Sequence, residues 1–526
     1  MRITNKIMQR NNLANINTNK IYQDKLSTQM STQKKINRPS DDPVVAIRAL
    51  RLRSNVTEVT QYYSKNIPDA ESWLTVTEDA LKNLTGIVTN MISQCTKGSN
   101  GDLTSSDREI ILEQLKALGD EVYSTGDADY AGRYVFTGYR TDTSLSFLKE
   151  ETIKYEITEQ LDNTAIDSLT KVNTGDLLGL TESNFTDATM GAITEQDVEA
   201  VEVYRIRLAY DDCTENQTPT IQFNKQVDPV TGEITFADTW TATKMNAHQD
   251  PYTQVANDPD AVVFVPETGE VLLGKNRYDT LMAVKDDIAT LSNEAEIRVT
   301  YEKEHWTQGT LRPEHYFHCK STDALSGDVI TYNADYFTEN AEKQSIEYDV
   351  GFNQTIRINS TADECFQHGI GREVDDLVES LQQVVDLEAI QKKLEAWQKD
   401  ADTTTVLANG LTEAETVKNQ LDAVGKALTL AKDKCQTAFE NGITAFQGYL
   451  DDANLCITNC GTRSSKLELI ENRMQNQKTT FETLKSENED VDITDVAIQL
   501  TSAELTYEAA LMATGKIVQT TLLNFI

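Results

Sequence analysis

The chain has 526 residues, 39% of them hydrophobic, and a formal net charge of −36. At about 150 residues per domain, this length predicts two to four domains. No run of roughly 18 uncharged apolar residues occurs, so the sequence predicts no membrane-spanning helix. The first residues lack the apolar stretch and cleavage site of a secretory signal, which predicts a protein that is either cytoplasmic or exported without a cleaved signal.

Charge is distributed unevenly along the chain. Residues 1–53 carry eleven Lys/Arg and three Asp/Glu, a net of +8, so the remaining residues sum to −44. An acidic body repels nucleic acid, and the basic arm has one aromatic residue, Tyr22, so it lacks the stacking platforms that single strands need. We therefore expect the basic arm to meet acidic surface on its own chain or on a neighbouring copy, and we expect no nucleic-acid partner.

The N-terminal segment predicts a weak helix. Its apolar residues are thinly spaced and include Ile3, Ile7, Ile21 and Leu26. An isolated helix of this kind is marginal in water, so we expect it to be mobile until a partner covers it. The run Pro39-Ser40-Asp41-Asp42-Pro43 then predicts a break, with Asp42 capping a new helix and Pro43 at its first position.

A long helix follows that break. From Leu52 to Cys95 apolar or small residues recur at steps of three or four, with a mean close to the 3.6 residues of a straight helix. One extra step of four, at Val59-Tyr63-Ile67 beside Pro68, predicts a kink or short break. A turn at 98–101 and a capping box beginning at Ser106 predict a second helix that returns antiparallel to the first.

Residues 141–371 change to alternating patterns typical of strands. The segment 262–273 predicts a hairpin, because two apolar runs flank Pro266-Glu267-Thr268-Gly269. The other expected strands are 201–210, 220–227, 234–240, 296–299, 328–332 and 346–358.

Helical patterns return after residue 372. We expect helices over 374–387, 417–450 and 467–484, an acidic turn at 487–492, and a last helix with one apolar stripe. That stripe contains Leu500, Tyr507, Leu511, Val518, Leu522 and Phe525. An apolar stripe at the end of a chain needs a partner.

The predicted fold class is α+β. A long antiparallel helical bundle formed by the N- and C-terminal segments would carry one or two inserted β-rich domains. The expected parts are an assembly helix (1–42), a helical rod (43–140), an outward β-rich insert (141–371), the rest of the rod (372–490) and a second assembly helix (491–526).

No catalytic constellation is present, so the sequence predicts no enzyme, no cofactor and no metal site. The run His315–Cys319 lacks further ligands at workable spacing and is expected to be an exposed segment. The acid pairs Asp211-Asp212 and Asp286-Asp287 are expected to be solvated. Seven scattered cysteines form no disulfide framework, and Cys456 and Cys460 are expected to face a helical core.

Several motifs resemble the flagellin superfamily. They are the opening Met1-Arg2-Ile3-Thr4, the Pro39–Pro43 run, the run containing Gly132, Arg133, Tyr134, Phe136 and Gly138, and the C-terminal segment 492–526. The forms at 39–43, 138–143 and 492–526 look more like the hook-associated protein 3 branch, the hook-filament junction proteins, than like flagellin. The match is specific at residues 1–147 and 460–526, and the insert and 372–459 depart from the family's shorter pattern.

The resemblance implies an extracellular structural subunit of the bacterial flagellum, exported without a cleaved signal peptide. It implies a ring of identical copies, with the adjacent hook-associated protein on the hook side, flagellin on the filament side, and an export chaperone holding the C-terminal helix. The subunit interface would be formed by Ile3, Ile7, Ile21, Leu26, Leu500, Tyr507, Leu511, Val518, Leu522 and Phe525. Two alternatives stay open: a filament flagellin, or a junction subunit whose β insert binds surfaces or glycans.

Overall fold

The computed structural model describes residues 5–101, 103–214, 217–227, 234–284, 296–322, 327–337, 344–404, 406–407 and 409–523. Two compact units are present. The terminal unit comprises Met1–Glu71, Tyr348–Ile356 and Ser464–Ile526, and the body unit comprises Ser72–Glu347 and Arg357–Arg463. Helices α3 (Ile67–Gly98) and α9 (Glu413–Glu489) each contain residues of both units.

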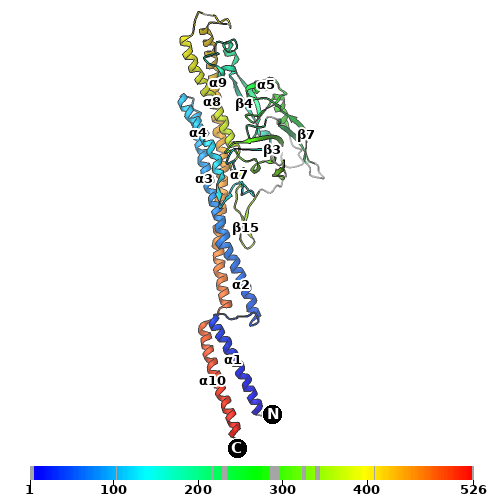
Figure 1. Cartoon of the computed structure of the whole chain (residues 1–526), viewed down its shortest axis with the longest axis vertical. Helices are drawn as coiled ribbons and strands as arrows, with labels where there is room; N and C mark the ends of the chain where they lie inside the picture. The colour runs from blue at the N-terminus through cyan, green and yellow to red at the C-terminus, as the bar shows by residue number, and fades with distance from the viewer. Residues whose placement is uncertain are drawn as a thin grey trace. The chain divides into compact units, whose positions relative to one another are not determined.

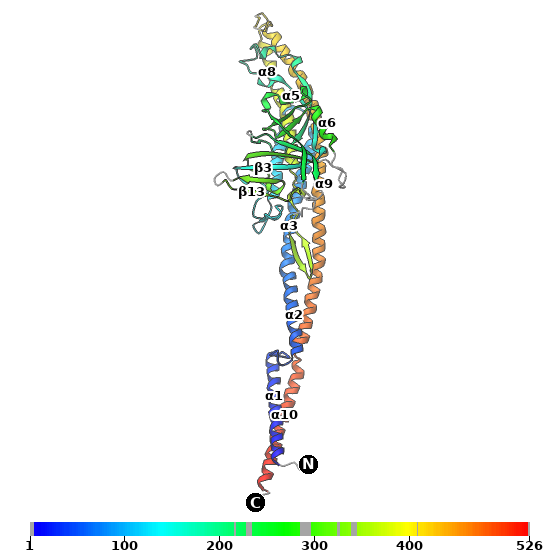
Figure 2. The ribbon, with the colours of Figure 1, turned by 90° about the vertical axis from the view of Figure 1, so that its right-hand side faces the viewer.

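The terminal unit contains the two ends of the chain. Helices α1 (Asn5–Thr32) and α10 (Ile493–Leu523) pack side by side, as both views show (Figures 1 and 2). The other elements of this unit are α2 (Pro43–Gln61), the π-helical segment η1 (Tyr62–Asn66), the start of α3, the end of α9, and the hairpin of β14 (Glu347–Gly351) and β15 (Gln354–Arg357). The small core between α1 and α10 consists of Leu26, Val496 and Ala503, with Leu500 partly buried.

The break between α1 and α2 follows the predicted chemistry. The Asp42 side chain accepts hydrogen bonds from the backbone N–H groups of Val44 and Val45, at 2.9 and 3.1 Å, and Pro43 is the first helical residue. Asp41 accepts from the N–H groups of Asn37 and Arg38 on the preceding turn. The predicted cap is therefore confirmed, and the side chains of both aspartates of the motif accept hydrogen bonds from the backbone.

The expected kink beside Pro68 takes a different form. The chain passes from α2 to α3 without a break, and η1 absorbs the extra residue as one turn of π-helix. A π-turn adds one residue to the helical repeat, which is what a surplus step of four requires. The Tyr62 ring, at the start of this turn, contacts Phe352 of the β14–β15 hairpin with centroids 5.8 Å apart.

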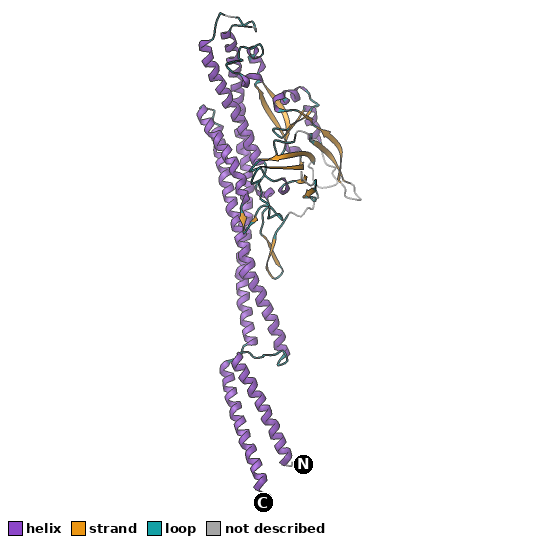
Figure 3. Ribbon diagram, viewed as in Figure 1, coloured by secondary structure: helices purple, strands orange, loops and turns teal. Residues whose placement is uncertain are grey.

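Long helices form one side of the body unit (Figure 3). They are α3 (Ile67–Gly98), α4 (Ser105–Ser124), α8 (Gly369–Asp400) and α9 (Glu413–Glu489). The short helix α7 (Ala362–Cys365) precedes α8. Two predictions were wrong in detail. Thr104, not Ser106, caps α4, and the 77 residues of α9 form one helix in place of the two expected.

The predicted helical stripes are buried in this unit. Cys456 and Cys460 of α9 face the core, as expected from their spacing. Other buried members include Leu74, Leu81, Leu84, Val88, Leu377, Leu381, Val384, Val424, Phe439 and Phe446.

Two antiparallel-rich sheets make up the insert. The six-stranded sheet has the order β13-β12-β3-β11-β6-β7, and every neighbouring pair is antiparallel. Its strands are β3 (Glu151–Leu161), β6 (Thr220–Val227), β7 (Ile234–Thr241), β11 (Ile297–Trp306), β12 (His318–Thr322) and β13 (Val329–Tyr332).

The five-stranded sheet has the order β4-β5-β10-β9-β8, in which β8 pairs parallel with β9. Its strands are β4 (Ile166–Asn173), β5 (Glu199–Arg207), β8 (Thr243–Lys244), β9 (Val262–Val265) and β10 (Glu270–Leu273). Helix α5 (Pro251–Asn257) packs on this sheet over a core that contains Val203, Tyr252 and Leu272. The predicted hairpin at 262–273 is confirmed residue for residue.

Short elements complete the body unit. They are β1 (Asp129–Tyr130), β2 (Arg133–Tyr134), α6 (Lys275–Ala283) and the 3-10 turns Thr125–Asp127, Asn163–Ala165, Gly175–Gly179, Met190–Ala192, Glu195–Asp197, Ala247–Gln249 and Pro313–His315. The predicted fold class, α+β with β-rich domains inserted into a helical framework, is confirmed. The five-part division of the chain stays a prediction.

The segment 315–319 contradicts its predicted exposure. Tyr316, Phe317 and Cys319 are all buried. His315 lies against the backbone, with Nε2 3.0 Å from the Ser144 carbonyl oxygen, and burial lowers its pKa to about 4. The aromatic residues of this run pack between the insert and the helices. The polar residues beside them in the sequence led to the wrong prediction of exposure. Asp211 and Asp212 are exposed as expected, and Asp286 and Asp287 lie outside the described residues.

Candidate subunit interface

The paired terminal helices leave apolar side chains uncovered. On α1, Ile21 is 64% exposed, and on α10, Leu511 is 46% exposed. Other apolar side chains exposed on these two helices are Ile7, Met8, Leu13, Tyr22, Met30, Ile493, Ile498, Leu505 and Met512. Two helices that pack only on each other cannot bury this much apolar surface, so the pair presents an uncovered face on each helix.

The predicted interface residues fall into four groups. Ile7, Ile21 and Leu511 are exposed and available to a partner. Leu26 is 2% exposed and packs between α1 and α10 of the same chain, so its contact is intramolecular. Leu500 and Tyr507 are partly buried. Ile3, Phe525 and the side chains of Val518 and Leu522 lie outside the described residues.

The basic arm meets the acidic turn of its own chain. Arg53 donates two hydrogen bonds to Glu489, from Nε at 2.6 Å and from a terminal nitrogen at 2.7 Å. Lys34 forms ion pairs with Glu489, at 3.7 Å, and with Asp490. The hydrogen bond from Arg53 lowers the pKa of Glu489, a carboxyl that is 3% exposed.

Backbone hydrogen bonds tie the same two segments together. The Lys35 N–H donates to the Glu489 carbonyl at 2.7 Å, and the Val491 N–H donates to the Gln33 carbonyl at 3.1 Å. The turn after α1 and the turn before α10 therefore form one small collar, defined here as residues 33–35 and 489–491. The collar therefore holds the C-terminal end of α1 next to the N-terminal end of α10.

Other cations of the arm have no such partner. Within the described part of the chain, Arg10, Lys20, Arg48 and Arg51 are exposed and form no ion pair. The chain thus uses part of its N-terminal charge internally and leaves the rest at the surface.

The glycine-rich motif at 132–138 joins the insert to the helices. Gly132 and Gly138 both have positive φ, at 77° and 62°, which glycine adopts without strain. The Arg133 guanidinium lies over the Trp73 ring, 5.0 Å from its centre. Phe136 packs against Phe366 with centroids 4.8 Å apart. The motif therefore contacts both the helices and the segment near Phe366, where the chain returns from the insert to the helices.

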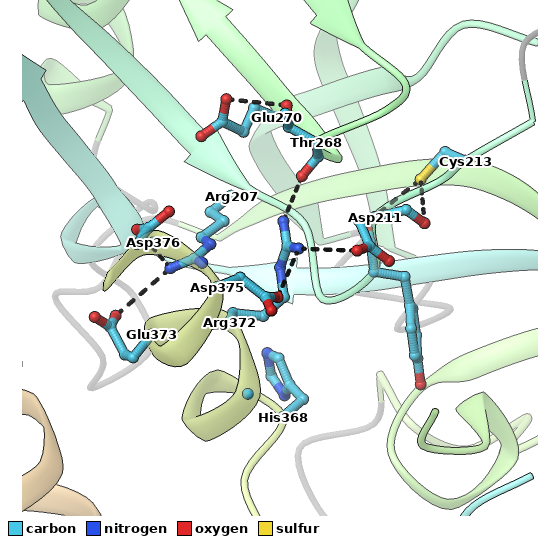
Figure 4. A network of polar contacts seen from close by, with 12 residues as sticks. Arg207, Asp211, Cys213, Thr268, Glu270, His368, Arg372, Glu373, Asp375 and Asp376 are labelled. Atoms are coloured by element: carbon cyan, nitrogen blue, oxygen red, sulfur yellow. Dashed lines mark hydrogen bonds and ion pairs between the residues drawn. The ribbon is translucent and has the colours of Figure 1, made fainter. Parts of the chain in front are cut away.

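An arginine cluster fastens the five-stranded sheet to α8 (Figure 4). Arg207 of β5 pairs with Asp376 at 2.9 Å and with Glu373 at 3.7 Å. Arg372 of α8 pairs with Asp375 at 3.3 Å and donates to the Thr268 carbonyl in the β9–β10 turn.

Arg205, on the same strand face as Arg207, completes the cluster. It is 5% exposed and pairs with Glu270 of β10 and with Asp376 of α8. This cluster was not predicted from the sequence. Its one visible signal is a pair of arginines two residues apart on a strand whose other inward residues are apolar.

No group of three or more His, Cys, Asp or Glu side chains among the described residues is arranged to hold a metal ion. None of the helices described combines the length and the apolarity needed to cross a bilayer.

The N-terminal part of the chain matches a known protein family. Residues 3–141 match the family described as the bacterial flagellin N-terminal helical region. These residues span α1 to β2 and include the cap at Asp42, the π-turn and the glycine-rich motif at 132–138. The N-terminal part of this chain is therefore similar to the N-terminal helical region of bacterial flagellin.

The curated relatives narrow the class. The chain is 30% identical over 208 residues to flagellar hook-associated protein 3 of Escherichia coli K12, covering 38% of this chain and 62% of that protein. It is 29% identical over 145 residues to flagellar hook-associated protein 3 of Salmonella typhimurium, covering 27% of this chain and 45% of that protein. The predicted resemblance to hook-associated protein 3 is confirmed, although the match spans less than two thirds of either relative.

A solved structure gives a weaker match. Flagellar hook associated protein-3 from Legionella pneumophila is 10% identical, with a TM-score of 0.26, covering 83% of this chain and 98% of that one.

Proposed function

We propose that this chain is a non-enzymatic structural subunit of the bacterial flagellum, located at the hook-filament junction. The observation that carries the proposal is the uncovered apolar surface of the α1–α10 pair, of which α1 lies in the region that matches the flagellin N-terminal family. Exposed apolar faces of this extent on a soluble surface indicate a protein–protein interface. The names of the two curated relatives, flagellar hook-associated protein 3, support a place next to the hook.

The joining elements are α1 and α10 of neighbouring copies. The collar holds both helices at one end, so their apolar faces are presented as a unit. Exposed cations such as Arg10 and Arg48 lie on the same arm, and the rest of the chain has a net charge of −44. Charge of opposite sign on neighbouring copies would orient their encounter and set the register.

In this proposal neighbouring copies join head to tail. Such contacts generate a ring of identical subunits when the rotation between copies closes. On one side the ring would contact the adjacent hook-associated protein, and on the other side flagellin. Export would take place without a cleaved signal peptide, with a chaperone covering the apolar face of α10 before assembly. The protein would act outside the cell and support motility.

The most direct test is a deletion strain examined by electron microscopy. Loss of a junction subunit leaves hooks without filaments and flagellin in the culture medium. Re-expression of the full chain should restore filaments and swimming. Normal filaments in the deletion strain would overturn the proposal.

A filament flagellin is the competing structural role. Labelling the protein on intact flagella separates the two, because a junction subunit is confined to the base of the filament. Label along the whole filament would favour the flagellin alternative.

A further inference from the structure

Two of the seven cysteines lie together in the body unit. All seven are buried and free in this structure. Cys365 is the last residue of α7, and Cys456 lies on α9. The Cys456 sulfur is 3.2 Å from the carbonyl oxygen of Glu364, the residue before Cys365, and the two thiols share a hydrogen bond. Cys460, one turn further on, directs its thiol to the Leu74 carbonyl at 3.3 Å instead.

The backbone around Cys365 is fixed in place. A capping box between Thr361 and Glu364 closes the single turn of α7, and the Ala362 N–H donates to the Phe136 carbonyl at 2.9 Å. The Phe366 carbonyl accepts from the Tyr316 hydroxyl at 2.7 Å. On the other side, Cys456 is in the middle of a 77-residue helix. The contact between the sulfurs is therefore set by two rigid elements.

The two thiols have different roles in this contact. The hydrogen bond from Cys365 lowers the pKa of Cys456, and the same bond, together with burial, raises the pKa of Cys365. A thiolate is the nucleophile in thiol–disulfide exchange. Cys456 is thus placed to react first and Cys365 to react second.

We propose that Cys365 and Cys456 form a disulfide when the chain folds in an oxidising environment. The inference rests on the proposed function, because a flagellar subunit exported to the cell surface meets such an environment, whereas the cytoplasm keeps thiols reduced. Both sulfurs are accessible while the exported chain is unfolded, and they become 1% and 6% exposed in the folded unit.

The oxidant is a low-molecular-weight disulfide. The Cys456 thiolate attacks one of its sulfur atoms, which forms a mixed disulfide and releases one small thiol. Cys365 loses its proton to water and attacks the Cys456 sulfur, which releases the second small thiol and forms the protein disulfide. Two protein thiols are oxidised and one small disulfide is reduced to two thiols.

The bond would tie the return of the insert to the long helix. Residues 366–455 would lie inside the closed loop, which contains α8 and half of α9. Closing a loop of this length restricts the unfolded chain, so the midpoint of thermal unfolding should rise by about 10 °C.

The test is a thiol count on the purified full-length chain after refolding with oxidised glutathione, or with a reductant as reference. The oxidised chain should lose two reactive thiols relative to the reduced chain, and digestion without reduction should give one peptide pair that links Cys365 to Cys456. C365S and C456S should lose none. C460S, which changes a buried cysteine on the same helix, should still lose two.

An unchanged thiol count in the refolded wild type, or a bond between any other two cysteines, would overturn the pairing. The count on purified protein does not depend on where the protein acts. Protein recovered from the extracellular fraction and trapped with acid and alkylating agent tests the location. Reduced Cys365 and Cys456 in that sample would overturn bond formation after export, whatever the result of the microscopy.

Discussion

Arg53 and Glu489 are 436 residues apart in the chain and form a two-bond ion pair at the base of the terminal helices. Glu489 is 3% exposed, whereas the Arg53 side chain is 56% exposed. The arginine thus covers a carboxylate at the end of α9 while its own far side stays in water. Arg53 therefore supports the collar from outside, through Glu489, and Lys34 adds a second cation within the collar.

Replacing Arg53 with alanine should weaken the collar. The carboxylate of Glu489 would remain buried without its main partner, at a cost of about 1 kcal/mol, which is below the range for fully buried pairs because Arg53 is half exposed. The measurement is urea denaturation monitored by a probe on α10. The lowered pKa of Glu489 means that this stabilisation is present above about pH 4.5 and is lost as pH falls through the pKa of the folded state.

Lys82→Ala is the matched control, because Lys82 pairs with Glu78 one turn away and both side chains reach solvent. That change should leave the urea midpoint close to that of the wild type, because exposed ion pairs contribute little to stability. Equal losses in the two variants would show that the Arg53 pair has no special role in the collar.

Replacing Arg205 with methionine should loosen the insert from α8. Arg205 and Glu270 are 5% and 3% exposed, so removal of the arginine leaves a buried carboxylate unpaired. Breaking a buried pair in this way costs roughly 3–5 kcal/mol. Hydrogen exchange should become faster in β5 and β10.

The exposed pair Lys116–Glu113 of α4 provides the control, with side chains 45% and 77% exposed. Lys116→Met should leave exchange in β5 and β10 unchanged. Full protection of both strands in the Arg205 variant would mean that packing alone fastens the insert.

Local elements of this fold could be predicted from the sequence, because each is specified by neighbouring residues. The hairpin at 262–273 has two apolar runs around a four-residue turn, and Asp42-Pro43 has the chemistry of a helix start. Strand β3, in the middle of the larger sheet, was missed because its inward position 159 is a glutamate. Glu159 is 1% exposed and accepts a hydrogen bond from the Ala209 N–H at 2.8 Å, which no local pattern reveals.

Contacts between distant segments could not be predicted in the same way. The basic arm and the acidic turn were each visible as charge, but the pairing of Arg53 with Glu489 requires that α2 and the end of α9 lie together. The Arg205–Asp376 pair joins residues 171 positions apart. For the same reason, the sequence could not distinguish Ile21 from Leu26 in the N-terminal helix. Only the position of α10 beside α1 shows that Ile21 is exposed and Leu26 is buried.

Stability of the body unit should depend on His368 between pH 6.5 and 4. Burial lowers the pKa of His368 to about 4, with Arg372 and Arg207 adding repulsion. The folded state therefore disfavours the proton that the unfolded chain takes up near pH 6.5. The contribution of His368 is complete above pH 6.5 and is lost as pH falls toward 4, by at most roughly 3 kcal/mol.

The difference between wild type and His368→Gln isolates this contribution, because all other titrating groups are common to both. The variant should lose part of the decline in stability between pH 6.5 and 4, measured by urea denaturation at each pH. His248→Gln, at an exposed position, is the control variant. Parallel profiles for His368→Gln and wild type would contradict the buried, neutral state of His368.

Leu511→Asp should separate folding from assembly. Leu511 is 46% exposed on α10, so an aspartate there is solvated in the single chain and should change its stability by less than about 0.5 kcal/mol. In an assembled ring the same carboxylate would be buried without a partner, at a cost of several kcal/mol per subunit. The variant should therefore be secreted and folded by circular dichroism, yet fail to support filaments or swimming.

Two further variants sharpen this result. Leu178→Asp changes an apolar residue of similar exposure, 43%, on the insert, and should leave filaments intact. Leu26→Asp introduces a charge between α1 and α10, so it should destabilise the pair in the single chain before any assembly step. Normal filaments with Leu511→Asp would mean that this face of α10 is not the subunit interface. Loss of filaments with Leu178→Asp would instead place an essential contact on the insert.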